Sequence, residues 1–227
     1  MKLKTLVIVF FSISVNSQNL KIIKDSVFVD SSFFLIEELK IVSKNERINN
    51  KIYVVTQSTY DVFEKPFIGE PEIRLMMKKD TICNRILKNS LRELNSGFEH
   101  YNIYYDKNNI INISIAIQTY GSPWKATQYY CFDLDNGNRI EKELFINQKK
   151  LLKTIKNKLK DQNIKLSITP NDLLNFKIIT YKNTSGIDFI IFDTENYRNS
   201  GYQEFIIHFE WKEIEKYIAP SYKNRLR

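Results

Sequence analysis

The sequence predicts an α+β fold in which a mainly antiparallel β-sheet packs with two amphipathic helices and a short C-terminal helix. Segments dense in β-branched and aromatic residues recur along the chain, as expected of strands. Two other segments, residues 72–94 and 147–160, carry apolar residues at three- and four-residue spacing, which is typical of helices. Strands and helices do not alternate regularly, so a doubly wound parallel sheet is disfavoured.

The first residues, MKLKTLVIVFFSISVNSQ, have the pattern of a signal peptide. Lys2 and Lys4 precede an apolar run of about ten residues, too short for a spanning helix of roughly 20. Ser17 marks a cleavage site before Gln18. We therefore expect residues 1–17 to be a signal peptide, and the mature chain to be periplasmic or extracellular without a transmembrane segment. An uncleaved anchor or a buried N-terminal strand remain alternatives.

The chain is basic, with a formal charge of +8 that falls to +6 when Lys2 and Lys4 leave with the signal. In an exported protein this charge does not indicate a nucleic-acid partner. It points instead to anionic cell-wall polymers or acidic protein faces, or simply to a solvated surface rich in lysine.

Residues 18–98 form a predicted N-terminal segment that is rich in strands and contains one helix. Strands are expected at 27–29 and 33–42, and residues 49–63, NNKIYVVTQSTYDVF, have strand-like composition. Gly69 to Pro71 breaks this pattern. A helix follows over 72–94, with its sheet-facing side formed by five residues: Ile82, Ile86, Leu87, Leu91 and Leu94.

Residues 99–220 form the second predicted unit. A strand leads to a turn at DKNN, a long strand follows, and another strand comes after a break at YGSP. Residues 147–160 form an amphipathic helix with leucines and isoleucine on one face and lysines on the other. Such a helix can lie on a membrane, although a domain helix with a solvated lysine face has the same pattern. Three more strands and a short helix, WKEIEKYI, close the fold before Pro220.

The two cysteines, Cys83 and Cys131, allow two interpretations. In an oxidising compartment they could form a disulfide between the helix and a strand, typically worth ~2–4 kcal/mol. They could equally be two free thiols that act as small hydrophobic residues.

The residues that usually carry catalysis or bind metals are sparse. The only histidines are His100 and His208, and the sequence lacks CxxC, HExxH and G-x-S-x-G motifs and a glycine-rich phosphate loop. A lone histidine in a strand such as EFIIHFEW is more typical of a structural role. We therefore expect no metal, no cofactor and no enzymatic activity.

The segment DLDNG, residues 133–137, has three interpretations. A calcium loop fails, because position five is Gly137 and position twelve is Leu144 where a glutamate is required. Asp133 and Asp135 could be paired catalytic carboxylates on one strand face. A type I′ hairpin turn with Asn136-Gly137 at its two central positions explains every residue, and it is the favoured interpretation.

The order of elements around this turn resembles a known domain. FDLDNG, then ELF and the helix INQKKLLKTIKNKL, with closing strands GIDFIIFD and YQEFIIHFEW, is similar to the C-terminal domain of RsiV-type anti-sigma factors and PdaC-type polysaccharide deacetylases. The resemblance covers roughly residues 101–218. In place of the family's Gly-Ala-His segment, this chain has YGSPWKAT. The resemblance implies the fold and an envelope-binding role, not lysozyme recognition or deacetylation.

Together these observations predict an exported, non-catalytic envelope binding module that recognises a protein or a cell-wall polysaccharide. The partner-binding candidates are Tyr120, Trp124, Lys125 and Tyr129, because exposed aromatic residues supply large contact areas at small entropic cost. The alternative function is a cell-wall glycan hydrolase that uses Asp133 and Asp135.

Overall fold

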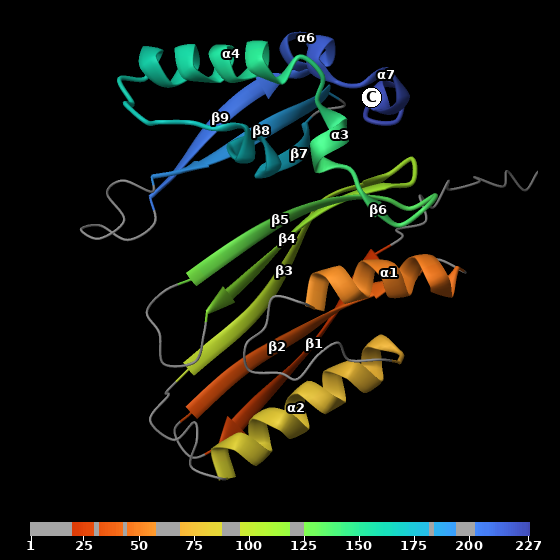
Figure 1. The fold of residues 1–227 in the computed structure, drawn as a ribbon. Helices are drawn as coiled ribbons and strands as arrows, with labels where there is room; N and C mark the ends of the chain where they lie inside the picture. The colour runs from red at the N-terminus through yellow and green to blue at the C-terminus, as the bar shows by residue number, and fades with distance from the viewer. Residues whose placement is uncertain are drawn as a thin grey trace, which may run out of the picture.

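The computed structural model describes residues 20–29, 32–42, 45–57, 69–87, 96–118, 125–181, 184–193 and 203–227. The predicted signal peptide lies outside them. Two sheets form the framework (Figure 1). The larger one contains, in spatial order, β1 (Leu20–Val29), β2 (Ser32–Ile41), β3 (Ser96–Lys107), β4 (Ile110–Gln118), β5 (Lys125–Asp133) and β6 (Asn138–Arg139). The smaller one contains β7 (Phe176–Tyr181), β8 (Thr184–Phe192) and β9 (Glu204–Glu210).

Every strand pair is antiparallel except β2 with β3, so the α+β class and its mainly antiparallel sheet are confirmed. The large sheet runs from Leu20 to Arg139. The predicted boundary between residues 98 and 99 therefore falls inside β3, and the two predicted units share one sheet.

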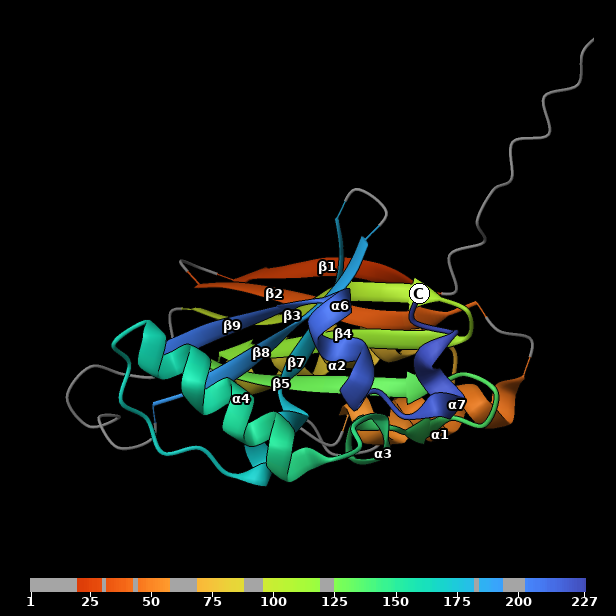
Figure 2. The same cartoon turned by 90° about the horizontal axis from the view of Figure 1, so that it is seen from above.

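The helices cover opposite sides of this framework (Figures 1 and 2). Two long helices, α1 (Glu46–Gln57) and α2 (Pro71–Leu87), lie below the large sheet in Figure 1. A third, α4 (Gln148–Asp161), lies on the outer face of the small sheet. Short helical segments complete the C-terminal half: α3 (Glu141–Leu144), η1 (Pro170–Leu174), α6 (Trp211–Ile214), η2 (Glu215–Tyr217) and α7 (Pro220–Lys223).

The expected strand over 49–63 is wrong, because residues 46–57 form α1 and the remainder lies outside the described residues. The buried residues of α1 follow helical spacing: Asn49, Ile52, Tyr53, Thr56 and Gln57. Packing of this face overrides the strand preference of the β-branched residues. The predicted helix over 72–94 is confirmed as α2 as far as residue 87, and Ile82 is buried in the core as expected.

Two hydrophobic cores flank the large sheet. The first lies towards α1 and α2 and contains Ile111 and Ile113 of β4 together with Ile52 of α1. The second lies towards the small sheet and α4, and contains Ile110 of β4, Ile155 of α4 and a cluster of aromatic rings, Phe145, Phe176, Phe189 and Phe209. Neighbouring residues of β4 therefore enter different cores, as the alternation of side chains along a strand requires.

The buried side chain of Asn112 connects the two sheets. Its amide Nδ2 donates to the carbonyl of Tyr130 at 3.0 Å and of Phe176 at 3.3 Å, and its Oδ1 accepts from the N–H of Ile178 at 2.7 Å. Asn112 thus binds the backbone of β7 as a neighbouring strand would, and it fixes the small sheet against β4.

Both expected turns of the large sheet are hairpins, but DLDNG does not form the two-residue type I′ turn that was predicted. DLDNG joins β5 to β6 through a four-residue loop, with Gly137 at a φ of 71°. The two-residue turn with two positive φ values is instead Asn108-Asn109, at 51° and 58°, between β3 and β4. At Gly137 a Cβ would lie 3.2 Å from the carbonyl oxygen of Ile48, so the loop packs closely under α1.

Replacing Asn112 by alanine removes three hydrogen bonds and leaves backbone groups of β7 buried without their partner. We expect Asn112→Ala to lower the free energy of unfolding by about 2–4 kcal/mol. Urea denaturation measures the loss. Asn102→Ala, which removes only part-buried contacts with Ser114 (3.4 Å) and His100 (3.1 Å), is the control and should cost much less. Equal losses in both variants would contradict the connecting role of Asn112.

Candidate interaction surface

Of the four predicted partner-binding residues, Lys125 and Tyr129 belong to β5. Tyr120 and Trp124 lie outside the described residues, as does the side chain of Lys125. Tyr129 is only 5% exposed and stacks on Tyr104, with ring centroids 6.3 Å apart. Burial and the nearby Glu204 raise the pKa of Tyr129 well above its ordinary value. The expectation that Tyr129 is exposed to a partner is therefore wrong, since its ring is part of the packing.

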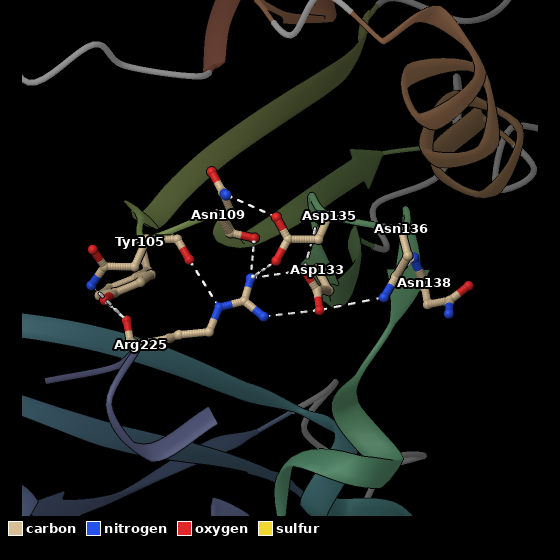
Figure 3. Close-up of polar contacts among 8 residues, drawn as sticks. Tyr105, Asn109, Asp133, Asp135, Asn136, Asn138 and Arg225 are labelled. Carbon is tan, nitrogen blue, oxygen red and sulfur yellow. Dashed lines mark hydrogen bonds and ion pairs between the residues drawn. The ribbon is translucent and has the colours of Figure 1, made fainter. Parts of the chain in front are cut away.

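The two aspartates of DLDNG are held by Arg225, from a segment near the C-terminal end (Figure 3). The guanidinium donates to both carboxylate oxygens of Asp133, at 2.9 and 2.7 Å, and lies 3.3 Å from Asp135. It also donates to the backbone carbonyls of Asn108 and Asn109 at 3.0 and 2.9 Å. One arginine thus joins the two hairpin turns of the large sheet.

Both carboxylate oxygens of Asp133 are occupied by hydrogen bonds from Arg225. Burial acts to raise its pKa, but the hydrogen bonds from Arg225 and from the N–H of Asp135 outweigh burial and lower the pKa below its ordinary value. The backbone of Arg225 is fixed as well, since the Tyr105 hydroxyl donates to its carbonyl at 2.6 Å. A carboxylate bound in this way is ionised and occupied, which is the behaviour of a structural residue.

Removing Arg225 should loosen the chain terminus and both hairpin turns. We expect Arg225→Ala to cost about 2 kcal/mol of stability, because each charge-assisted hydrogen bond contributes about 1.5–3 kcal/mol and the site is partly exposed. Because the folded pKa of Asp133 is depressed, its contribution is complete above the unfolded pKa of about 3.9 and disappears as pH falls through the folded value. Urea unfolding at neutral and acidic pH tests this: the gap between wild type and Arg225→Ala should narrow in acid.

The cysteines are both free thiols. Cys83 packs beside the first core and Cys131 is buried in the second, where burial raises its pKa well above the ordinary value. The structure therefore agrees with the two-thiol interpretation and not with the disulfide.

The histidines occupy polar positions on strands. His100 lies 3.1 Å from Glu37 and 3.1 Å from Asn102, between β2 and β3. His208 of β9 lies 2.8 Å from Asp188 of β8, beside a pocket of about 300 Å³ that Trp211 and Lys212 also line. Among the described residues, no three His, Cys, Asp or Glu side chains gather as a metal site requires.

Charged residues fill the seam where β2 and β3 separate. These strands pair only over Phe33–Leu35 and Ser96–Phe98. Beyond this point the carboxylate of Glu37 accepts from the N–H of Tyr101 at 2.7 Å, in place of a strand partner. Glu37, Glu38 and Glu99 are all almost fully buried here.

The cations that neutralise Glu38 and Glu99 come from α2, whereas Glu37 pairs with Lys24 of β1 at 2.7 Å. Lys78 is fully buried, with Nζ 2.7 Å from Glu99 and 2.9 Å from Glu38. Arg74 is 1% exposed, lies 3.3 Å from Glu38 and stacks on the Tyr53 ring. Burial acts to lower the pKa of Lys78, but Glu99 and Glu38 outweigh it and raise the pKa, so the lysine stays charged.

Two charged residues of α2 face inward, and three of its large apolar residues face solvent. The side towards the sheet consists of five buried residues at helical spacing: Pro71, Arg74, Leu75, Lys78 and Ile82. On the outer side Ile73, Met76 and Met77 are 48%, 56% and 40% exposed. We call these three residues the α2 stripe. An ordinary surface helix keeps its charged residues on the solvent side and its large apolar residues in the core, whereas α2 places both kinds on both sides.

The sequence analysis missed the α2 stripe because it followed only the apolar residues from Ile82 onward. A usable signal was present: Arg74 and Lys78 are in helical phase with Ile82, while Ile73, Met76 and Met77 are not. Methionine side chains are flexible and polarisable, which suits them to binding surfaces. The arrangement is chemically suited to recognition of an apolar surface.

The overall arrangement recurs in known structures. A member of the DUF3298 family from Bacteroides fragilis matches with a TM-score of 0.59 and 13% sequence identity, over 93% of this chain and 99% of that one. A DUF3298 family protein from Pseudomonas aeruginosa matches with a TM-score of 0.50 and 9% identity, over 88% and 94%. At these identities the likeness shows a shared fold.

Sequence comparison adds no closer assignment, since no protein-family model matches the chain and no curated protein matches it. Within the described residues, none of the helices combines the length and apolar content that a bilayer crossing demands.

Proposed function

We propose that this chain is an exported, non-catalytic binding module of the cell envelope that recognises another envelope protein through the α2 stripe. The observation that carries this proposal is the orientation of α2, which buries Arg74 and Lys78 and exposes Ile73, Met76 and Met77. The signal-like N-terminus supports the location. The sequence resemblance to the RsiV and PdaC C-terminal domain supports an envelope-binding role.

The charges around the α2 stripe favour a different protein over a second copy. Glu70 and Asp80 are exposed beside it, and neither forms an ion pair with another described residue. In a symmetric dimer each copy would present the same acidic rim to the other, and like charges would repel. A partner with an apolar centre and a basic rim fits better. The hydrolase alternative lacks comparable support, because hydrogen bonds from Arg225 occupy both carboxylate oxygens of Asp133.

Met76→Lys places a charge in the centre of the α2 stripe. We expect stability to change by at most about 0.5 kcal/mol, since the side chain is exposed, while partner binding weakens at least tenfold. A photo-crosslinking residue at position 76 identifies the partner in intact cells, and titration of that purified partner against wild type and Met76→Lys measures the loss. Thr154→Lys, on the far side of the molecule, is the control. A crosslink between two copies of this chain, or equal affinity of all variants, would contradict the proposal.

Export is tested separately. We expect the secreted or periplasmic fraction to contain a chain that begins at Gln18, as measured by intact mass and N-terminal sequencing. Replacing Leu6 and Val7 with aspartates interrupts the apolar run and should keep the precursor in the cytosol. A cytosolic wild-type chain that still begins at Met1 would refute this prediction.

A further inference from the structure

The outer face of α4 carries a row of lysines. Leu151, Ile155 and Leu159 are at most 1% exposed in the second core, and they fix the orientation of the helix. Lys149, Lys153, Lys156 and Lys160 are exposed on the solvent side. Their steps of four, three and four residues place them along one side of the helix over roughly 16 Å. We call these four residues the α4 row.

The α4 row is not neutralised by the fold. Lys158, which is not part of the row, binds Glu213 at 2.9 Å and lies over the Phe209 ring. In contrast, no described carboxylate lies within ion-pair distance of the four lysines of the row. The first turn of α4 has no acidic residue, and the only acidic residue in the helix is Asp161 at its end.

This charge pattern disfavours the helix that carries it. Like charges four residues apart destabilise a helix, and Lys149 in the first turn opposes the helix dipole. Asp161 is likewise at the unfavourable end. The N-cap residue, Asn147, forms no side-chain capping hydrogen bond. The helix persists because its apolar side is buried. Local features that conflict with the global fold are typical of functional sites.

Two physical constraints limit the classes of partner that the α4 row can bind. A membrane-lying helix inserts its apolar side into lipid, but that side of α4 is occupied by the second core. The helix forms the outer layer over the small sheet, on the side of the molecule away from α2 (Figures 1 and 2). A straight row of regularly spaced cations is complementary to a chain with regularly spaced anions, which binds along the row and releases its counterions.

We propose that the α4 row binds a linear polyanion of the cell wall, a polymer with a phosphate or carboxylate in each repeat. The choice of a wall polymer rests on the proposed export of the chain. The surface is distinct from the α2 stripe and lies on the opposite side of the molecule, so both can be occupied together. The module would then be held on the wall by α4 while α2 faces its protein partner.

The test compares Lys153→Gln/Lys156→Gln with Lys21→Gln/Lys107→Gln, a control that removes two exposed lysines elsewhere. The probes are poly(glycerol phosphate) and polygalacturonate, with dextran as the neutral polymer and duplex DNA as a competing polyanion. Calorimetric titration at several salt concentrations measures the affinity. Wild type should bind at least one of the two wall-type polymers and not dextran. The α4 variant should bind roughly tenfold more weakly or worse and with a smaller salt dependence, while the control stays within about twofold.

Thermal unfolding separates binding from a structural role. Because the glutamines relieve repulsion, the melting temperature of the α4 variant should be unchanged or higher. Four outcomes would each overturn the proposal. These are a lower melting temperature of the α4 variant, an equal loss of affinity in the control, tighter binding to DNA than to the wall-type polymers, and no binding by wild type. Photo-crosslinking at position 76 should persist in the α4 variant. Failure of the α4 row is thus distinguishable from failure of the proposed protein recognition.

Discussion

One buried amide, that of Asn112, determines how the two halves of the molecule are arranged. Asn112 lies near the start of β4 and hydrogen-bonds to the backbone of Phe176 and Ile178 in β7, as a neighbouring strand would. An amide or backbone group left without a hydrogen bond at this buried position would cost free energy. The small sheet therefore takes the position in which the hydrogen bonds of Asn112 are all formed. With the sheets fixed, α2 and α4 necessarily face opposite sides, and each presents its outer surface without interference from the other.

The helices α2 and α4 differ in the kinds of residue that they bury. The reason is the chemical character of the sheet on which each helix packs. Under α4 the sheet is apolar, so leucine and isoleucine face inward and lysine faces outward. Under α2 the strands β2 and β3 diverge, and the carboxylates of Glu38 and Glu99 are buried beside the seam, where they require cations. Arg74 and Lys78 meet that requirement, so the apolar residues of α2 remain outside. The α2 stripe is therefore linked to the ionic seam.

Features that depend on local periodicity could be predicted from the sequence. The apolar side of α4, the presence of a hairpin at DLDNG and most of α2 follow from spacing and turn chemistry. The helix α1 could not, because its β-branched residues favour a strand and only packing reverses that preference. The contact of Arg225 with Asp133 joins residues 92 positions apart, and no local pattern indicates it. The burial of Tyr129 depends in the same way on β3, which supplies Tyr104.

The distance in sequence between Asp133 and Arg225 also governs when the fold can be completed. At typical synthesis rates, 92 residues take roughly 5–20 s to emerge. During that interval the turn around Asp133 has its carboxylate but lacks the arginine that binds it, and β4 lacks the strand that Asn112 holds, 66 positions further on. Contacts of such long range form late and slowly. The junction between the two sheets therefore closes only near the end of synthesis, after all residues of the first core, which lie between Leu20 and Leu134, have been made.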